Sequence, residues 1–445
     1  MPKRHLQLDV STQSVALQRG TITASGLTDA TLDQISVLNP RLNAFLHVDA
    51  EGASAAARAS DERLARGRPL SALDGITVAV TDNIDVAGMP TTAGMTTRRG
   101  RVAQRDAFVV RRLRDAGAVI VGKLNMQEAA LGNSTDNPFY GRCEHPTHAG
   151  HSPGGSSGGS ACAVAAQLCA LALGTDTLGS VRIPAAYCGV VGFKATRGQI
   201  SNGGMVGCGD VLDHVGPIVR SLADLRTVLP QLVAYDAGHW LSQRTSTRQA
   251  LSHPRLLAAR DLDQLGVADE VIAAYRSALD RLRDRGHNVV ETSLGGFDFA
   301  RARSAGLLIV QTRLLLEHAD DWREQPQHFS PELTQWLRDA EGQSALALAQ
   351  AERVVQAAHL EAARWFQIAD VMVLPTAPQT APRWGEPTPD GAADLAIIAN
   401  LAGLPALSAP LPRPEGALPI GLQFIAPMNG DATLLALDLR GVVAA

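Results

Sequence analysis

Two glycine-rich turns, each holding a serine, constrain this chain more than any other feature. The first is residues 154–160 (GGSSGGS) and the second is residues 174–184 (GTDTLGSVRIP), so that Ser156 and Ser180 lie 24 residues apart. Glycine tolerates backbone conformations that other residues avoid, and it lets backbone segments approach closely. The apolar stretch between the turns predicts a helix over 161–168 and a buried strand over 171–173. We therefore expect the two turns to pack against each other.

Along the rest of the chain, short β-branched runs alternate with helical spacing, which favours an α/β architecture. The pattern predicts strands at 76–80, 118–121, 371–376, 406–409 and 420–425, and helices over 27–66, 107–115 and near 395–401. Residues 132–160 form a polar loop that ends in the first serine turn. Loops of that length inside a compact domain are usually functional or disordered, and we favour a functional one.

Composition excludes several classes of protein. A hydrophobic fraction of 45%, a charged fraction of 19% and a formal net charge of −4 are ordinary for a soluble globular protein and give no reason to expect a nucleic-acid or membrane partner. No apolar run reaches the ~18 residues of a membrane helix. The five cysteines form no CxxC pair, which argues against disulfide and metal frameworks. We expect a cytoplasmic protein without metal or cofactor, and we interpret His145, His148 and His151 as solvated loop side chains.

The second turn offers the groups that cleavage of an amide bond requires. Such cleavage needs an activated oxygen nucleophile, a proton shuttle and donors for the tetrahedral oxyanion. The backbone N–H groups of Thr177, Leu178 and Gly179 can converge on one oxygen. Ser180 opens a predicted helix, whose N-terminus adds positive potential. This arrangement indicates a hydrolase that activates the Ser180 hydroxyl through that of Ser156.

Other interpretations of the first turn are weaker. Residues 154–158 match the G-x-S-x-G nucleophile elbow, but that elbow follows a buried strand, and residues 145–152 are polar. A phosphate-binding loop would continue into Gly-Lys-Ser/Thr, which does not follow here. A flexible linker would not explain the second serine turn.

Taken in order along the chain, these motifs resemble those of the amidase signature family. The resemblance rests on the two serine turns, Asn400 and residues 122–126 (GKLNM), 132–135 (GNST), 188–194 (CGVVGFK), 212–217 (LDHVGP), 403–405 (GLP) and 419–423 (PIGLQ). It implies one large α/β domain, with a mixed, mostly parallel central sheet covered by helices on both faces. It also implies hydrolysis of a C–N bond in a small amide or urea-like substrate by a Ser–cis-Ser–Lys triad.

The resemblance assigns roles to individual residues. It makes Ser180 the acylating nucleophile and Ser156 the bridging serine, in a cis peptide bond with Gly155. The oxyanion-hole turn corresponds to Thr177, Leu178 and Gly179. Supporting positions correspond to Asp176, Arg182, Ser157 and Gly155. Candidates for the substrate pocket are Asn133, Ser134, Thr135 and His214.

On the same basis, we divide the single domain 1–445 into four parts. They are an N-terminal helical part (1–70), a catalytic core (71–235), a largely helical insert or cover (236–340) and the C-terminal part of the core (341–445). Members of the family include one of the subunits of tRNA-dependent amidotransferases, which holds small partner proteins. A homodimer and a pairing with a small helical subunit therefore both stay open.

Two positions depart from the family pattern. The family lysine precedes an Asp-Asn pair, and this chain has Thr81 in that place. A threonine hydroxyl is no base at neutral pH, whereas a desolvated lysine can take the proton of a serine. Since loss of a triad member can cost on the order of 10⁴–10⁶ in turnover, we expect severely impaired hydrolysis. The second departure is Leu178, which stands where many members have glycine, and we interpret it as shaping the pocket.

Three explanations of Thr81 stay open. An engineered replacement would mean that the natural chain carries lysine there. A non-catalytic member of the family would bind a ligand or a partner. Another base, such as a substrate amine or a bound water, would serve a different acyl-transfer reaction, since Lys123 and Lys194 belong to other family motifs.

Overall fold

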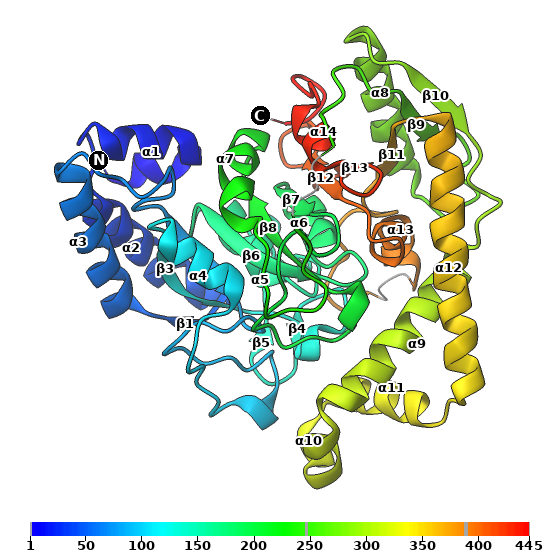
Figure 1. Cartoon of the computed structure of the whole chain (residues 1–445), viewed down its shortest axis with the longest axis horizontal. Coiled ribbons are helices and arrows are strands. Elements are labelled where there is room, and N and C mark those ends of the chain that lie inside the picture. Colours follow the sequence, from blue (N-terminus) through cyan, green and yellow to red (C-terminus); the bar gives the residue numbers. More distant parts are fainter. Residues whose placement is uncertain (1, 245–247, 387–389, 445) are drawn as a thin grey trace.

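The computed structural model describes residues 2–244, 248–386 and 390–444. In this part of the chain an eleven-stranded sheet forms the centre, in the order β1-β3-β2-β6-β8-β7-β12-β13-β11-β9-β10 (Figure 1). Its strands are β1 (Phe45–Val48), β2 (Thr77–Thr81), β3 (Val119–Leu124), β6 (Leu171–Asp176), β7 (Val191–Lys194), β8 (His214–Val219), β9 (Leu256–Ala259), β10 (Val289–Thr292), β11 (Val371–Pro375), β12 (Ala406–Pro410) and β13 (Gly421–Ile425). A separate two-stranded ribbon consists of β4 (Asp136–Asn137) and β5 (Gly141–Arg142).

Helices cover both faces of this sheet, as the resemblance implied. They are α1 (Val10–Gln18), α2 (Ala24–Leu42), α3 (Ala50–Ala65), α4 (Phe108–Asp115), α5 (Gly158–Ala165), α6 (Arg182–Cys188), α7 (Leu222–Leu232), α8 (Asp269–Asp284), α9 (Phe299–Glu317), α10 (Ala319–Glu324), α11 (Pro331–Glu341), α12 (Ala345–Ile368), α13 (Asp394–Leu401) and α14 (Asp431–Ala436). The short helices α5 and α6, which follow the two serine turns, are almost wholly buried. The turns are thus anchored in the core of the domain.

The order of the strands brings Thr81 and the second serine turn to the same edge of the sheet. Strand β2 runs parallel to both β3 and β6, with Val80 opposite Lys123 on one side and Leu173 on the other. The carboxyl ends of parallel neighbours point the same way, and ligands of α/β sheets bind beyond such ends. Thr81, at the end of β2, therefore lies beside the segment that leads into the second serine turn.

The helical prediction for 27–66 is wrong in its middle. Asn43 ends α2 in a left-handed conformation (φ 47°), and β1 then pairs antiparallel with β3 before α3 begins. The prediction of a largely helical segment at 236–340 also missed two strands. There β9 and β10 pair in parallel with each other, and β9 pairs with β11, which extends the central sheet. Four-residue strands carry too little pattern to be separated from helical surroundings.

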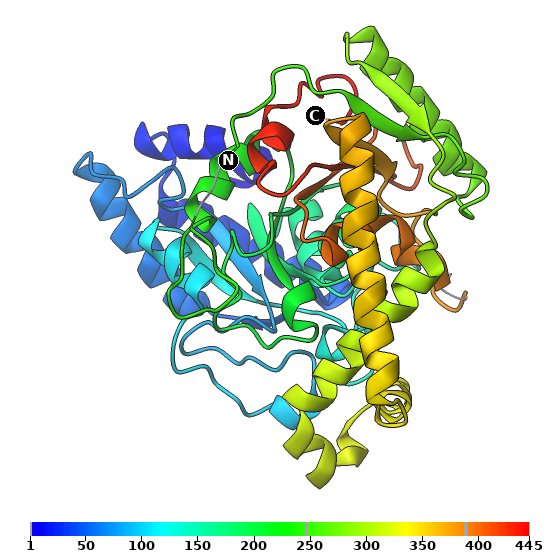
Figure 2. The ribbon, with the colours of Figure 1, turned by 45° about the vertical axis from the view of Figure 1, so that its right-hand side comes forward.

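Helices α9, α11 and α12 pack together at one side of the molecule and form a group that we call the cover (Figures 1 and 2). The local sequence fixes where two of these helices begin. Ser330 caps α11 by accepting a hydrogen bond from Leu333 N, and Ser344 caps α12 in the same way through Ala347 N. The cover packs on α13, and Gly306 of α9 lies against the side chain of Leu178 in the second serine turn.

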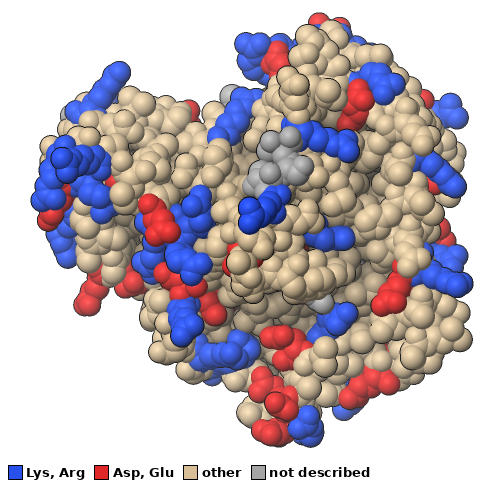
Figure 3. Space-filling view, in the orientation of Figure 1, with Lys and Arg blue, Asp and Glu red and all other residues tan. Residues whose placement is uncertain are grey.

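Basic and acidic side chains are interspersed on the face of the molecule seen in Figure 3. This distribution agrees with the small net charge of the chain and offers no basic stripe on that face. Among the described residues, no helix combines the length and apolar character needed to cross a bilayer.

Candidate active site

The two serine turns pack against each other through Ser157. Its backbone N–H donates to the carbonyl oxygen of Ser180 at 3.3 Å. Its hydroxyl donates to the carbonyl oxygen of Thr175 at 3.2 Å and accepts from the N–H of Thr175 at 3.0 Å. The peptide bond between Gly155 and Ser156 is cis. A Cβ at Gly155 would lie 2.6 Å from Ser134 N, so only glycine fits this contact.

Asp176 braces the second turn from within the core. Its carboxylate accepts hydrogen bonds from the N–H groups of Gly179 and Val181 at 2.9 and 3.2 Å. Arg182 donates to it twice, each time at 2.9 Å, and both side chains are fully buried. Although burial by itself raises the pKa of this carboxyl group, the guanidinium of Arg182 and the amide of Asn400 hold the pKa well below its usual range. Asp176 is therefore ionised, its charge is paired with that of Arg182, and both of its oxygens accept hydrogen bonds.

Two residues from the C-terminal part of the chain complete this brace. The side-chain amide of Asn400 donates to Asp176 at 2.8 Å, while its oxygen accepts from Arg182 at 2.6 Å. The amide oxygen of Gln423 accepts a further hydrogen bond from Arg182. The motifs around these two residues are recognisable in the sequence, but their contact with the turn depends on the fold.

One of the three predicted oxyanion donors is already bonded within the turn. The N–H of Gly179 donates to Asp176, whereas the N–H groups of Thr177, Leu178 and Ser180 donate to no protein acceptor among the described residues. The hydroxyl of Thr177 donates to Asp213 at 2.6 Å, and Asp213 in turn accepts from the N–H groups of Cys208 and Gly209. The second serine turn thus has free backbone donors on both sides of Gly179.

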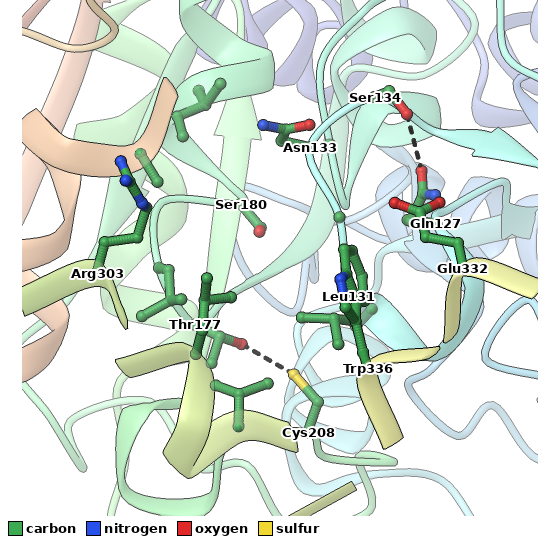
Figure 4. A pocket seen from close by; sticks show the side chains of 18 residues that line it. Gln127, Leu131, Asn133, Ser134, Thr177, Ser180, Cys208, Arg303, Glu332 and Trp336 are labelled. Carbon is green, nitrogen blue, oxygen red and sulfur yellow. Dashed lines mark hydrogen bonds between the residues drawn. The ribbon is translucent and has the colours of Figure 1, made fainter. Parts of the chain in front are cut away.

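Ser180 opens onto a cavity of about 430 Å³. The core contributes Gln127, Leu131, Asn133, Ser134, Thr177 and Cys208 to its lining, and the cover contributes Arg303, Leu307, Val310, Glu332 and Trp336. Figure 4 shows Ser180 between Asn133 and Thr177, with Arg303 on one side and Glu332 and Trp336 on the other. Arg303 is paired with Asp394 at 2.7 Å, and burial followed by the charge of Asp136 raises the pKa of Glu332.

Two of the four predicted pocket residues do not line the cavity. Asn133 and Ser134 line the cavity, but Thr135 and His214 are not among its lining residues. Thr135 is fully buried, and its hydroxyl donates to Gly154 O at 2.7 Å and accepts from Gly158 N at 3.0 Å. His214 is buried on β8, where its Nδ1 lies 2.8 Å from Leu212 O. Thr135 is thus bonded to the first serine turn, and His214 lies beside Asp176 at the start of the second.

The hydroxyl of Thr81 does not reach a serine. It is fully buried and donates to the sulfur of Met126 at 3.5 Å. The next residue, Gln127, donates its N–H to the carbonyl oxygen of Ser156 at 3.0 Å, so the end of β2 and the first serine turn share one supporting segment. Ser156 itself is 1% exposed, and its hydroxyl has no hydrogen-bond partner among the described residues.

Lys123 and Lys194 are both buried, and their amines are bonded to groups other than the two serines. The amine of Lys123 lies 3.2 Å from Asp82 and donates to Pro90 O at 2.8 Å and to Thr91 Oγ1 at 3.1 Å. Burial lowers the pKa of Lys194 well below its usual value, and Arg182 lowers it further. Its amine donates to Ala195 O, on the side of the Asp176–Arg182 pair.

The interpretation of the loop histidines as solvated is wrong for two of them. His145 is fully buried, its Nε2 lies 2.8 Å from Tyr187 O, and burial lowers its pKa to about 4. His151 is 9% exposed, and the ring of His148 lies edge to face against the rings of His145 and His151. Among the described residues, no group of histidine, cysteine, aspartate and glutamate side chains has the arrangement of a metal site.

One buried acid was missed by sequence reasoning. Glu128 is 3% exposed and accepts a hydrogen bond from the N–H of Ser330, the residue that caps α11. Burial raises its pKa to about 7. Its position after the 122–126 motif was the available signal, but the contact joins residues that are far apart in the sequence.

Comparisons with known proteins agree with this geometry. The amidase family, described simply as Amidase, matches residues 26–435. The A-type subunit of the glutamyl-tRNA(Gln) amidotransferase of Chloroflexus aggregans is 36% identical over 96% of this chain and 94% of its own length. The corresponding protein of Anaeromyxobacter is 38% identical over 93% and 91%. The chain therefore belongs to the amidase family.

Solved structures extend the likeness to the whole fold. One solved structure is described as an unexpected vestigial protein complex that reveals the evolutionary origins of an s-triazine catabolic enzyme. Its TM-score to this chain is 0.89 at 30% identity, and the match covers 98% of this chain and 97% of that one. The native peptide amidase of Stenotrophomonas maltophilia has a TM-score of 0.83 at 28% identity, with 97% and 95% covered. The class defined by fold and family is that of enzymes acting on C–N bonds.

Proposed function

We propose that this protein is an amide hydrolase scaffold in which Ser180 is the nucleophile and whose proton-transfer step is impaired because Thr81 stands in place of the base. One observation carries this proposal. The oxyanion turn is fully braced and opens Ser180 onto a cavity, while the hydroxyl of Thr81 is bonded to Met126. The substrate is a small amide or urea-like molecule, in keeping with the size of the cavity.

The chemistry follows from the positions of these groups. The oxygen of Ser180 attacks the substrate carbonyl carbon, and the negative oxygen that forms is stabilised by the N–H groups of Leu178 and Ser180. Ser156 accepts the proton of Ser180 and passes its own proton on. A lysine at position 81 would take that proton and return it to the leaving nitrogen, and water would then release the acyl group from Ser180.

The test is ammonia release from a panel of small amides, ureas and carboxamides, measured for the chain and for Thr81→Lys. We expect turnover with the lysine variant and only traces with the unaltered chain. Thr81→Arg is a matched control, since it adds a cation that cannot act as a base. Normal turnover by the unaltered chain would refute the impairment, and equal activity of the arginine variant would refute the role of the amine.

A partner chain is a second part of the proposal. The relatives are named as subunits of an amidotransferase, and one solved structure is described as a protein complex. We propose that this chain pairs either with a second copy or with a small helical protein, and that it resides in the cytoplasm, where its five buried free cysteines stay reduced. The mass of the natural complex in light scattering, followed by identification of its components, distinguishes the two arrangements.

A further inference from the structure

Two charged side chains line the cavity that opens at Ser180, and they differ in their pairing. They are Arg303 on α9 and Glu332 on α11. The guanidinium of Arg303 lies 2.7 Å from the carboxylate of Asp394, which balances its charge. In the described part of the chain, no basic side chain forms an ion pair or a hydrogen bond with the carboxylate of Glu332. This leaves the cavity with a negative charge that no described residue balances.

The surroundings of Glu332 disfavour its ionised form. Partial burial raises the pKa of this carboxyl group, and the negative charge of Asp136 raises it further. Asp136 is itself paired with Arg142 at 3.1 Å, so the guanidinium of Arg142 is engaged by a different carboxylate. A positive charge placed beside Glu332 would offset both effects, because an opposite charge nearby stabilises the anion. The carboxylate therefore favours a ligand that carries a cationic group.

A second side chain on the same helix has an affinity for cations. Trp336 follows Glu332 by four residues on α11, and residues at this spacing lie on one face of a helix. Both line the cavity, and Figure 4 shows them on the same side of Ser180, opposite Arg303. The face of an indole ring attracts an ammonium group. Apolar side chains also line the cavity, and they include Leu131, Leu307 and Val310.

We propose that the substrate is an amide that carries a primary ammonium group on a short methylene chain, and that Glu332 and Trp336 select this group. This inference rests on the proposed function and names the class of its substrate. With the carbonyl carbon at Ser180, the methylenes lie against the apolar lining, and the ammonium donates to Glu332 beside the indole ring. Because Glu332 is exposed to solvent as well as lining the cavity, the ammonium stays partly hydrated and the selectivity is moderate.

The test measures binding, so it does not depend on turnover. The Ser180→Ala chain is titrated with 4-aminobutanamide and 5-aminopentanamide, and with their neutral isosteres pentanamide and hexanamide, and binding is followed by ligand-observed NMR. At neutral pH and low salt, we expect each amino amide to bind about tenfold more tightly than its isostere, which combines a partly screened ion pair with a cation–π contact. Added salt should reduce the difference. The anionic amides succinamate and glutaramate should bind more weakly than the neutral ones.

Three variants in the Ser180→Ala background identify the residues that select the ammonium. Glu332→Gln should remove most of the preference and leave the affinity for neutral amides unchanged. A role limited to the first turn of α11, where an acidic side chain interacts with the helix dipole, would not change the ratio between charged and neutral amides. Trp336→Leu should weaken the amino amides more than their isosteres. Asp339→Asn, at an exposed position of the same helix, is the matched control and should change nothing.

The outcomes separate this inference from the proposed function. If the amino amides bind no more tightly than their isosteres, or do not bind at all, the inference is wrong. Tighter binding of succinamate or glutaramate would also overturn it and would make Arg303 the anchor of the substrate. The proposed function is tested by ammonia release from Thr81→Lys, in which Ser180 is intact. Release without any preference for amino amides would leave the proposed function standing alone. A binding preference without release would refute the proposed hydrolysis and leave the selectivity of the cavity.

Discussion

The two sides of Ser180 differ in how well their buried polar and charged groups are paired. On the oxyanion side, from Asp176 to Arg182, the buried charges are paired and the carboxylate of Asp176 is surrounded by donors. On the base side, around Thr81 and Asn83, buried polar atoms lack partners among the described residues. A buried charge must be compensated for the fold to persist, whereas an unpaired hydroxyl or amide oxygen costs only about 1–3 kcal/mol. Under the proposed function, the segment that would stabilise the transition state is therefore tied to folding, while the segment that would move the proton can vary.

The largest expected effect is on the base side. Thr81→Lys should raise the rate of ammonia release by about 10⁴-fold, since loss of a triad member has a cost of that order. If the amine acts through the bridging serine, Ser156→Ala in the Thr81→Lys background should remove most of this gain. Single-turnover rates of the unaltered chain, of each single variant and of the double variant measure the coupling between positions 81 and 156. Retention of the gain without the hydroxyl of Ser156 would mean that the two sides of Ser180 are connected by another route.

The next effect concerns the stability of the oxyanion side. Asp176→Asn leaves the guanidinium of Arg182 buried without its counter-ion, so the free energy of unfolding should fall by about 3–5 kcal/mol. Urea titrations followed by circular dichroism give the value. Asp438→Asn is the matched control, because Asp438 pairs with Arg440 at the surface and its loss should hardly change stability. Similar results for both variants would show that the brace is not tied to folding.

A smaller effect is expected on the geometry of the turn. Gly179 has φ 120°, and a Cβ there would lie 2.8 Å from Ile183 Cδ1 and 2.9 Å from Ala396 Cβ. In the Thr81→Lys background, Gly179→Ala should therefore displace the free N–H groups and lower kcat by about 10²–10³-fold. Gly266→Ala, at φ 70° with nothing nearby, is the control for strain alone. An unchanged kcat for Gly179→Ala would show that the oxyanion donors lie elsewhere.

The smallest effect is expected on the pH dependence of stability, at the contact between Glu128 of the core and the start of α11 in the cover. Burial raises the pKa of Glu128 from 4.5 to about 7, so the folded state binds the extra proton between these values. Stability from this group is therefore full below about pH 4.5 and is lost as the pH rises to about 7, a change of about 3 kcal/mol. Glu128→Gln stays neutral and should flatten this part of the stability profile. Melting temperatures between pH 4.5 and 8 test it, with the exposed Glu352→Gln as the control.

The sequence predicted several strands of the core and the largely helical character of residues 236–340, but it missed short strands. The strands expected at 76–80 and 371–376 are β2 and β11, and the two serine turns pack against each other as expected. Strands β1, β9 and β10 were missed, because each has only four residues and lies among helical segments. Hydrophobic periodicity and turn residues identify helices and strands that have a strong local sequence pattern. They do not identify short strands that are stabilised by their neighbours in the sheet.

Residues of the pocket that come from the cover could not be predicted. Arg303, Glu332 and Trp336 lie on helices whose sequence carries no motif, and only the packing of α9 and α11 brings them to Ser180. The candidates Thr135 and His214 do not line this cavity for a related reason. A motif records which residues are near each other along the chain, but the direction in which each side chain points depends on the surrounding structure.

From the sequence alone it follows that this chain carries two serine turns on an α/β framework and that a threonine occupies the position where a base is expected. Glycines at fixed spacing and the identity of one residue are local facts, and local backbone preferences follow from them directly. The tertiary contacts are responsible for the bond from the N–H of Gly179 to Asp176 and for the brace that Asn400 and Gln423 complete. They also leave the hydroxyl of Ser156 and the amide oxygen of Asn83 without a partner among the described residues. These outcomes depend on contacts between distant segments, whose geometry is set by packing of the whole domain.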